Sequence, residues 1–167
     1  MAKAKTGSFY IRRTVNVDAT SPDLVTIDTS AYVDPADRQG IMIESVDFVF
    51  FDSSTNLPIN PTGVEAVGVQ LLAGAYTTLQ PFDEEDLIAS GGLLFAGNGN
   101  GMGHATDVYP DVLGSEDGRK IVDDQMSLLG LSQSAFTNAR CAVLIKAKVI
   151  TLTNKDYMAL AMQTVAN

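Results

Sequence analysis

Three stretches of this chain alternate between apolar and polar residues, and this pattern constrains the fold more than any other feature of the sequence. They span residues 9–18, 41–51 and 141–153. Because successive side chains of a β-strand point to opposite faces, a period of two is typical of a strand with one buried face. Two shorter stretches, 24–28 and 67–71, alternate in the same way. The chain is therefore predicted to fold mainly as β-sheet.

The stretch 41–51 changes phase along its length. The two apolar sets of opposite parity are Ile41 and Ile43, and Val46, Phe48 and Phe50. One extra residue in the strand, a β-bulge near Glu44-Ser45, would bring both sets onto one buried face. Val49 and Phe51 are apolar as well, so we expect the end of this strand to be covered on both sides.

The regions between these strands are rich in turn residues. Residues 52–63 are predicted to form a loop, and the glycine-rich run 97–103 a hairpin or loop tip, because alternating Gly tolerates positive φ. Asp83 is placed to cap a short helix over residues 84–89. Residues 104–140 show no clear period and are expected to form a long excursion over the surface.

The segment 156–165 has two interpretations. Its Ala, Leu, Met and Gln residues favour a helix, and Thr153 and Asp156 have the spacing of a capping box. In contrast, Met158, Leu160 and Met162 alternate with alanines, which favours a strand that pairs back onto 143–153 after a turn at Asn154-Lys155. The strand is the interpretation that we favour.

Side chains that usually carry catalysis are scarce. The chain contains one histidine, His104, one cysteine, Cys141, and no tryptophan. Since zinc sites and nucleophilic catalysis need several such groups, we predict no catalytic residue, no cofactor and no zinc site, and hence no enzyme. A structural Ca²⁺ held by acids between Asp107 and Asp124 stays open as an alternative. Cys141 opens an apolar strand and is expected to be buried as a small apolar residue.

Charge is unevenly distributed along the chain. The basic residues near its start are Lys3, Lys5, Arg12 and Arg13. Residues 1–17 contain no acid, so this part carries +4 and the rest of the chain, whose net charge is −9, carries −13. We expect a basic N-terminal arm, about residues 1–8, that contacts a neighbouring copy, a membrane or a nucleic acid together with Arg12 and Arg13.

The length of 167 residues fits one domain, 1–167. Short strands separated by turns predict an all-β, antiparallel β-sandwich or jelly roll of about eight strands, with one short helix and long loops. The chain then resembles the small single-jelly-roll major capsid proteins of tailless icosahedral viruses of archaea and some bacteria. The resemblance is carried by the basic start without a secretory signal, by Val25–Asp28 and Ile41–Val46, and by Val149–Leu160. It covers the whole chain in outline, without a diagnostic motif.

The resemblance implies a structural protein that forms an icosahedral shell, often over an internal membrane. The implied partners are copies of the chain and other capsid proteins, and for the arm an internal membrane or the genome, with no small-molecule substrate. The implied location is the virion, after synthesis in the host cytoplasm. The alternative is a carbohydrate-binding or adhesive β-sandwich, which is disfavoured because the start resembles no secretory signal and no Trp can stack on sugars. The rest of the chain beyond residues 1–17, at −13, should repel the same part of neighbouring copies, so salt or divalent cations are expected to strengthen assembly.

Overall fold

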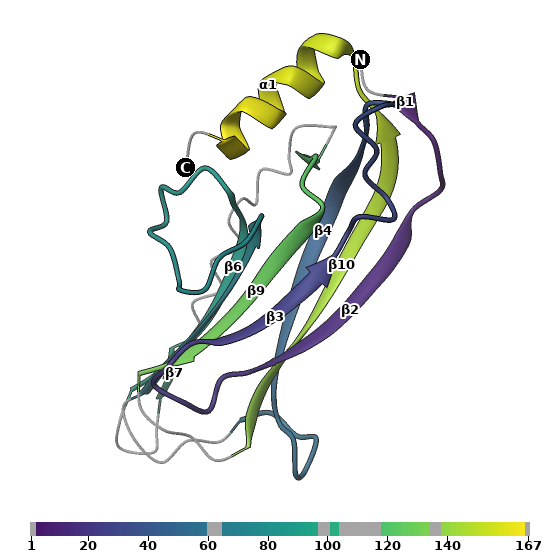
Figure 1. Ribbon diagram of the computed structural model, residues 1–167. Helices are drawn as coiled ribbons and strands as arrows, with labels where there is room; N and C mark the ends of the chain where they lie inside the picture. Colours follow the sequence, from purple (N-terminus) through teal and green to yellow (C-terminus); the bar gives the residue numbers. More distant parts are fainter. Residues whose placement is uncertain (1–2, 60–64, 97–100, 104–117, 134–137, 166–167) are drawn as a thin grey trace.

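Two antiparallel sheets lie face to face, and one helix crosses an end of the sandwich (Figure 1). The computed structural model describes residues 3–59, 65–96, 101–103, 118–133 and 138–165. Sheet A consists of β1 (Lys3–Ala4), β2 (Phe9–Asn16), β4 (Gln39–Asp52), β8 (Arg119–Ile121) and β10 (Ala139–Thr151). Sheet B consists of β3 (Asp23–Asp28), β5 (Glu65–Ala73), β6 (Leu87–Ala96), β7 (Gly101–Gly103) and β9 (Gln125–Ser132). The helix is α1 (Asn154–Val165).

The order of the strands is that of a jelly roll. Sheet A runs β2-β10-β4-β8, with β1 also on β10, and sheet B runs β3-β9-β5-β6-β7. The pairs β2/β10, β3/β9, β4/β8 and β5/β6 are those of one long hairpin whose tip lies between β5 and β6. This hairpin is wrapped so that β4 also pairs with β10, and β5 with β9. The predicted fold class is confirmed, with β1 and β7 added to the eight strands of the roll.

The core lies between the sheets, and two glycines allow the sheets to approach closely. Its fully buried side chains include Ile27, Ile41, Ile43, Leu71, Ile88, Met126, Leu128 and Ile145. Gly91 of β6 faces Phe48 of β4, and a Cβ at this glycine would lie 2.8 Å from the Phe48 Cγ. Gly130 of β9 lies against the backbone carbonyl of Asn16 in β2, where a Cβ would clash. The sheets are therefore packed on each other at both positions.

The five predicted strands are confirmed as β2, β3, β4, β5 and β10, and so is the bulge in β4. Lys146 pairs with Ser45 and Ala147 with Ile43, which leaves Glu44 as the extra residue. The expectation that the end of this strand is covered on both sides is wrong. Val49 is 59% exposed on the outer face of sheet A.

The predicted helix at 84–89 is wrong, because residues 87–89 begin strand β6. Leu87 and Ile88 are both buried, Ile88 in the core between the sheets and Leu87 in a separate cluster with Leu72 and Leu129. A segment buried on both faces of a sheet does not alternate, and an apolar run after acidic residues then resembles the start of a helix.

The predicted surface excursion over 104–140 is also wrong for most of the residues that the structure describes there. Residues 119–121 form β8, and residues 125–132 form β9, which lies inside sheet B between β3 and β5. Residues 104–117 lie outside the described part of the chain, as do 97–100 of the glycine run. The rest of that run forms β7, which pairs with β6 as expected of a hairpin.

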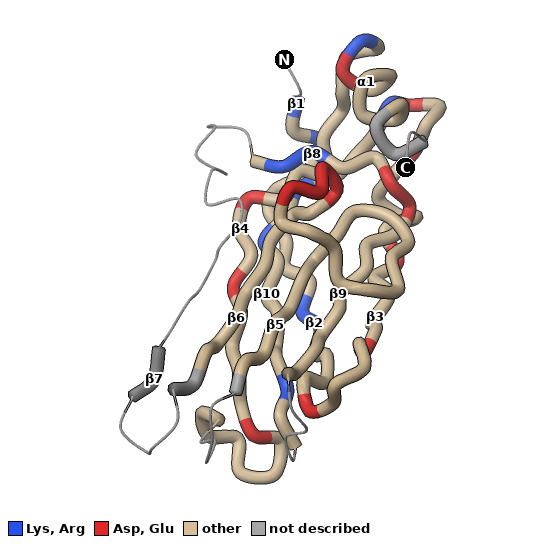
Figure 2. Tube along the Cα trace, turned by 90° about the vertical axis from the view of Figure 1, so that its left-hand side faces the viewer, with Lys and Arg blue, Asp and Glu red and all other residues tan. Residues whose placement is uncertain are grey.

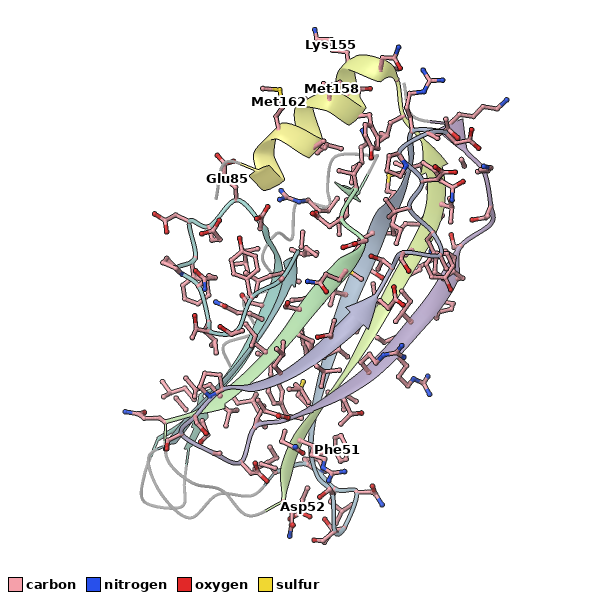
Figure 3. The ribbon with its side chains drawn as sticks, in the orientation of Figure 1. Phe51, Asp52, Glu85, Lys155, Met158 and Met162 are labelled. Atoms are coloured by element: carbon pink, nitrogen blue, oxygen red, sulfur yellow. The ribbon has the colours of Figure 1, made fainter. Side chains whose placement is uncertain are left out.

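The favoured strand at 156–165 is wrong, since α1 occupies this segment. The Thr153 hydroxyl accepts a hydrogen bond from the Asp156 amide at 3.2 Å, as the capping-box interpretation requires. Tyr157 and Leu160 pack on a small cluster built around Ile150. Figure 3 shows the opposite side of the helix pointing away from the sandwich, with Met158 59% and Met162 67% exposed. The helix therefore closes one end of the sandwich.

Candidate assembly surfaces

The outer face of sheet A is an open surface that mixes apolar and basic side chains. Strands β2, β10 and β4 form this face, and their pairing places Lys146 between Tyr10 and Ser45. Tyr10 is 63% and Val49 59% exposed. The basic residues that point outward here are Arg12, Arg140, Lys146 and Lys148. Because it combines exposed apolar side chains with arginines, this face is a candidate surface for contact with another protein.

One carboxylate binds two of these lysines. Glu44, the bulge residue, lies 3.2 Å from the Lys146 Nζ and 2.9 Å from the Lys148 Nζ, and the Ser8 hydroxyl donates a hydrogen bond to it at 2.7 Å. These contacts lower the pKa of Glu44 to about 2, and the hydrogen bond from Lys148 has the largest effect on this pKa. Glu44 thus places one negative charge between two positive ones, and the surface around it stays basic.

The predicted arm residues Lys3 and Lys5 are exposed and lie along the end of sheet A. Lys3 belongs to β1 and pairs with Thr151 of β10. The Lys5 Nζ donates a hydrogen bond to the Gln39 Oε1 at 2.6 Å and lies 3.7 Å from the Asp37 carboxylate. The start of the chain is therefore docked on the sheet over residues 3–6, and its part in assembly stays a prediction.

Arg12 and Arg13, the other two predicted residues, lie within β2 at an edge of sheet A rather than on an arm. Arg13 has the parity of the core residues Ile11 and Val15, yet it is exposed. Its guanidinium donates a hydrogen bond to the Arg12 carbonyl at 2.9 Å. A charge of inward parity on an edge strand hinders pairing with a strand of another molecule. Arg13 therefore protects this edge.

The outer side of sheet B is partly covered by the loop 74–86. The Tyr76 amide donates to the Ser127 hydroxyl at 2.9 Å. The Gln70 side chain binds both the amide and the carbonyl of Gln80, at 2.7 and 2.8 Å. These contacts hold the loop on the sheet and satisfy the buried amide of Gln70.

Next to this loop, an apolar groove of about 220 Å³ opens on the outer side of sheet B. Its floor includes Gly68 and Gly92, which lie opposite each other on β5 and β6. Leu79, Phe82 and Leu94 are among its walls, and none of its lining residues is charged. Phe82 is 59% and Leu94 49% exposed. The sequence did not predict this groove, because it depends on the register that brings the two glycines together.

The two sides of the sandwich carry opposite charge. The strands of sheet A contain eight Lys or Arg and three Asp or Glu. The strands of sheet B together with the loop 74–86 contain seven Asp or Glu and no Lys or Arg. Figure 2 shows the acidic tip of this loop in red beside the blue β8 of the other sheet, where the Arg119 guanidinium donates a hydrogen bond to the Glu85 carbonyl, with further blue segments on β10 and β2. The charge asymmetry that the sequence shows near its start thus belongs to the whole of sheet A.

Metal-binding side chains do not converge in the described part of the chain. Cys141 is fully buried, as predicted, and burial raises the pKa of its thiol to about 12. Among the described residues, no three His, Cys, Asp or Glu side chains are placed to hold a metal ion. His104 and the acids at 107–117 lie outside these residues. None of the described helices has the length and apolar composition to cross a membrane.

No protein-family model matches this chain, and no curated protein is similar to it in sequence.

Proposed function

We propose that this chain is a major capsid protein that self-assembles into an icosahedral virus shell. The observation that supports this most is the complete eight-strand jelly roll, an architecture used by viral capsid domains and by lectins. A sandwich works through its outer surfaces when its interior is filled by side chains, and here the interior is a continuous apolar core.

The surfaces favour contact with other proteins over contact with sugars. The groove beside the loop 74–86 offers one exposed aromatic ring, Phe82, and the amide of Gln70 on its floor already binds Gln80. Lectin sites need polar groups free to bind sugar hydroxyls as well as rings to stack on. Large exposed apolar residues on both outer faces, among them Tyr10 and Leu94, instead suit burial against protein.

Electron microscopy of the purified chain tests this proposal. We expect closed shells, or sheets and rings of regular spacing, to form as protein concentration rises. A chain that stays a single copy at every concentration and binds immobilised glycans would contradict the proposal and favour the carbohydrate-binding alternative.

The start of the chain provides a second test. Residues 3–8 are exposed, and β1 contributes only two residues to sheet A, so deletion of residues 2–7 should leave the domain folded. We expect this deletion to impair assembly by removing Lys3 and Lys5. An unchanged particle yield, with an unchanged melting temperature, would show that the N-terminal segment has no part in assembly.

A further inference from the structure

We propose that neighbouring copies contact each other head to tail, with the outer face of sheet A of one copy on the outer side of sheet B of the next. This contact rests on the proposed self-assembly and specifies its geometry. Sheet A presents Arg12 and Arg140 on its outer face, whereas the outer side of sheet B presents Asp28, and the loop 74–86 that borders it presents Asp83 and Glu85. The strands of sheet B and this loop contain no basic residue, although Arg119 of β8 reaches the loop and donates a hydrogen bond to the Glu85 carbonyl at the end nearest α1 (Figure 3). Oppositely charged patches attract and select this pairing over contacts between like faces.

The two faces also offer a protruding side chain and a groove of comparable size. An exposed aromatic side chain, Tyr10, stands on sheet A, and an uncharged apolar groove lies on sheet B. The groove volume of about 220 Å³ exceeds that of cavities of roughly 150 Å³ that hold a benzene ring. Tyrosine is common among the residues that dominate binding energy. Tyr10 of one copy therefore fits the groove between Phe82 and Leu94 of the next.

The free edge of sheet A disfavours another mode of association. Arg13 obstructs the edge of β2, so extension of the sheet from copy to copy is hindered there. A contact between two different faces is heterologous and does not close as a two-fold dimer, so it continues from copy to copy, into a ring where the rotation closes and into an open filament where it does not. A shell requires the form that closes.

Charge reversal on each face tests the pairing. The first variant is Arg12→Glu with Arg140→Glu, and the second is Asp83→Lys with Glu85→Lys; all four side chains are exposed. We expect each variant alone to lose assembly and to sediment as a single copy. The second variant is the stricter test, because its net charge changes from −9 to −5 and general repulsion between copies falls.

Combining the reversals separates head-to-tail contact from contact between like faces. One chain that carries all four substitutions should assemble again, since the acidic sheet A of each copy then meets a basic patch on the next. A mixture of the two variants should also assemble, but it does not distinguish the faces, because both faces of one variant then oppose both faces of the other in charge. If the wild-type chain assembles but the four-fold variant does not, or if either variant alone still assembles, the head-to-tail contact is wrong while the proposed function stands. If the wild-type chain does not assemble at all, the proposed function itself fails.

Disulfide trapping tests the place of Tyr10. Cys141 is buried, so newly introduced surface cysteines are the reactive ones. A mixture of Tyr10→Cys and Leu94→Cys chains should form a crosslinked pair under mild oxidation, and neither chain should crosslink with itself. Crosslinks between two Tyr10→Cys chains would instead show that sheet A faces sheet A, which contradicts the proposal.

Discussion

At the scale of single residues, Glu44 links the bulge in β4 to the basic face of sheet A. Its carboxylate is 21% exposed and binds Lys146, Lys148 and Ser8. Because its pKa is lowered from 4.5 to about 2 in the folded chain, the ionised form stabilises the fold above pH 4.5. This contribution is lost as pH falls from 4.5 through 2.

Substitution of Glu44 by glutamine should therefore lower the free energy of unfolding by roughly 1–3 kcal/mol at neutral pH, allowing for partial exposure to solvent. The difference from the wild-type chain should vanish near pH 2. Urea denaturation at several pH values measures it, and Asp47→Asn, an exposed position of the same strand, is the control with the same change in charge. An equal loss near pH 2 and at neutral pH would mean that the new amide side chain disturbs packing and that no ion pair is involved.

Contact between the sheets depends on the fit between Gly91 and Phe48. An added Cβ at Gly91 would approach the base of the Phe48 ring, which cannot move aside freely, so Gly91→Ala should cost roughly 1–3 kcal/mol. Gly68→Ala is the matched control, because its Cβ would lie 3.8 Å from the nearest atom, in the Leu79 side chain.

Phe48 is half-buried, so Phe48→Ala should cost about 2–3 kcal/mol. In the double variant, Gly91→Ala should add little to the loss in free energy of unfolding that Phe48→Ala causes alone, because the ring is gone. If the two losses simply add, Gly91 and Phe48 are not in contact.

At the scale of elements, α1 packs against the sandwich with one face only, and this face stabilises the helix. Burial, together with the nearby carboxylates of Asp34 and Asp123, raises the pKa of Tyr157, which agrees with its packing against the end of the sandwich. Met158, the next residue along the helix, is 59% exposed. Neighbouring residues of this helix therefore differ in how closely they contact the sandwich.

Tyr157→Ala should lower the free energy of unfolding by about 1–3 kcal/mol, because it removes an aromatic side chain from a partly buried site. Met158→Ala should change it by less than about 0.5 kcal/mol, since alanine is a good helix former and the site is exposed. Thermal denaturation of the two variants compares them. Equal losses would show that both faces of the helix are covered in the native protein.

Elements with one open face could be predicted from the sequence, and those covered on both sides could not. β2 and β10 alternate because their outer residues meet water. β9 and the start of β6 are buried on both faces, by the core and by the loop 74–86, so their sequences contain apolar runs without a period. In α1 the alternation of methionines is incidental, and the informative signal is the hydroxyl of Thr153.

The candidate surfaces could be predicted only in part for a similar reason. The basic residues Lys3, Lys5, Arg12 and Arg13 are visible as an excess near the start of the chain. Their membership of one face follows from the pairing of β1 and β2 with β10, which joins segments far apart along the chain. The groove above Gly68 likewise depends on cross-strand register, which short-range patterns do not encode.

At the scale of the whole molecule, the distribution of charge matters more than its sum. A net charge of −9 alone predicts that copies repel and that salt strengthens assembly. Segregation of basic residues to sheet A and acidic residues to sheet B predicts the opposite at the contact, because salt screens the attraction between the two faces. Salt screens both effects, with a screening length that falls from about 30 Å at 0.01 M to about 3 Å at 1 M, so the direction in which assembly changes with salt shows which of the two controls it.

Sedimentation velocity of the wild-type chain across this salt range tests the central claim, that the sandwich functions by associating with copies of itself through its outer faces. We predict multi-copy assemblies at low salt that shift toward smaller species as salt rises. Assembly that grows with salt would contradict attraction between opposite faces, and a single-copy species at every salt and protein concentration would contradict self-assembly itself.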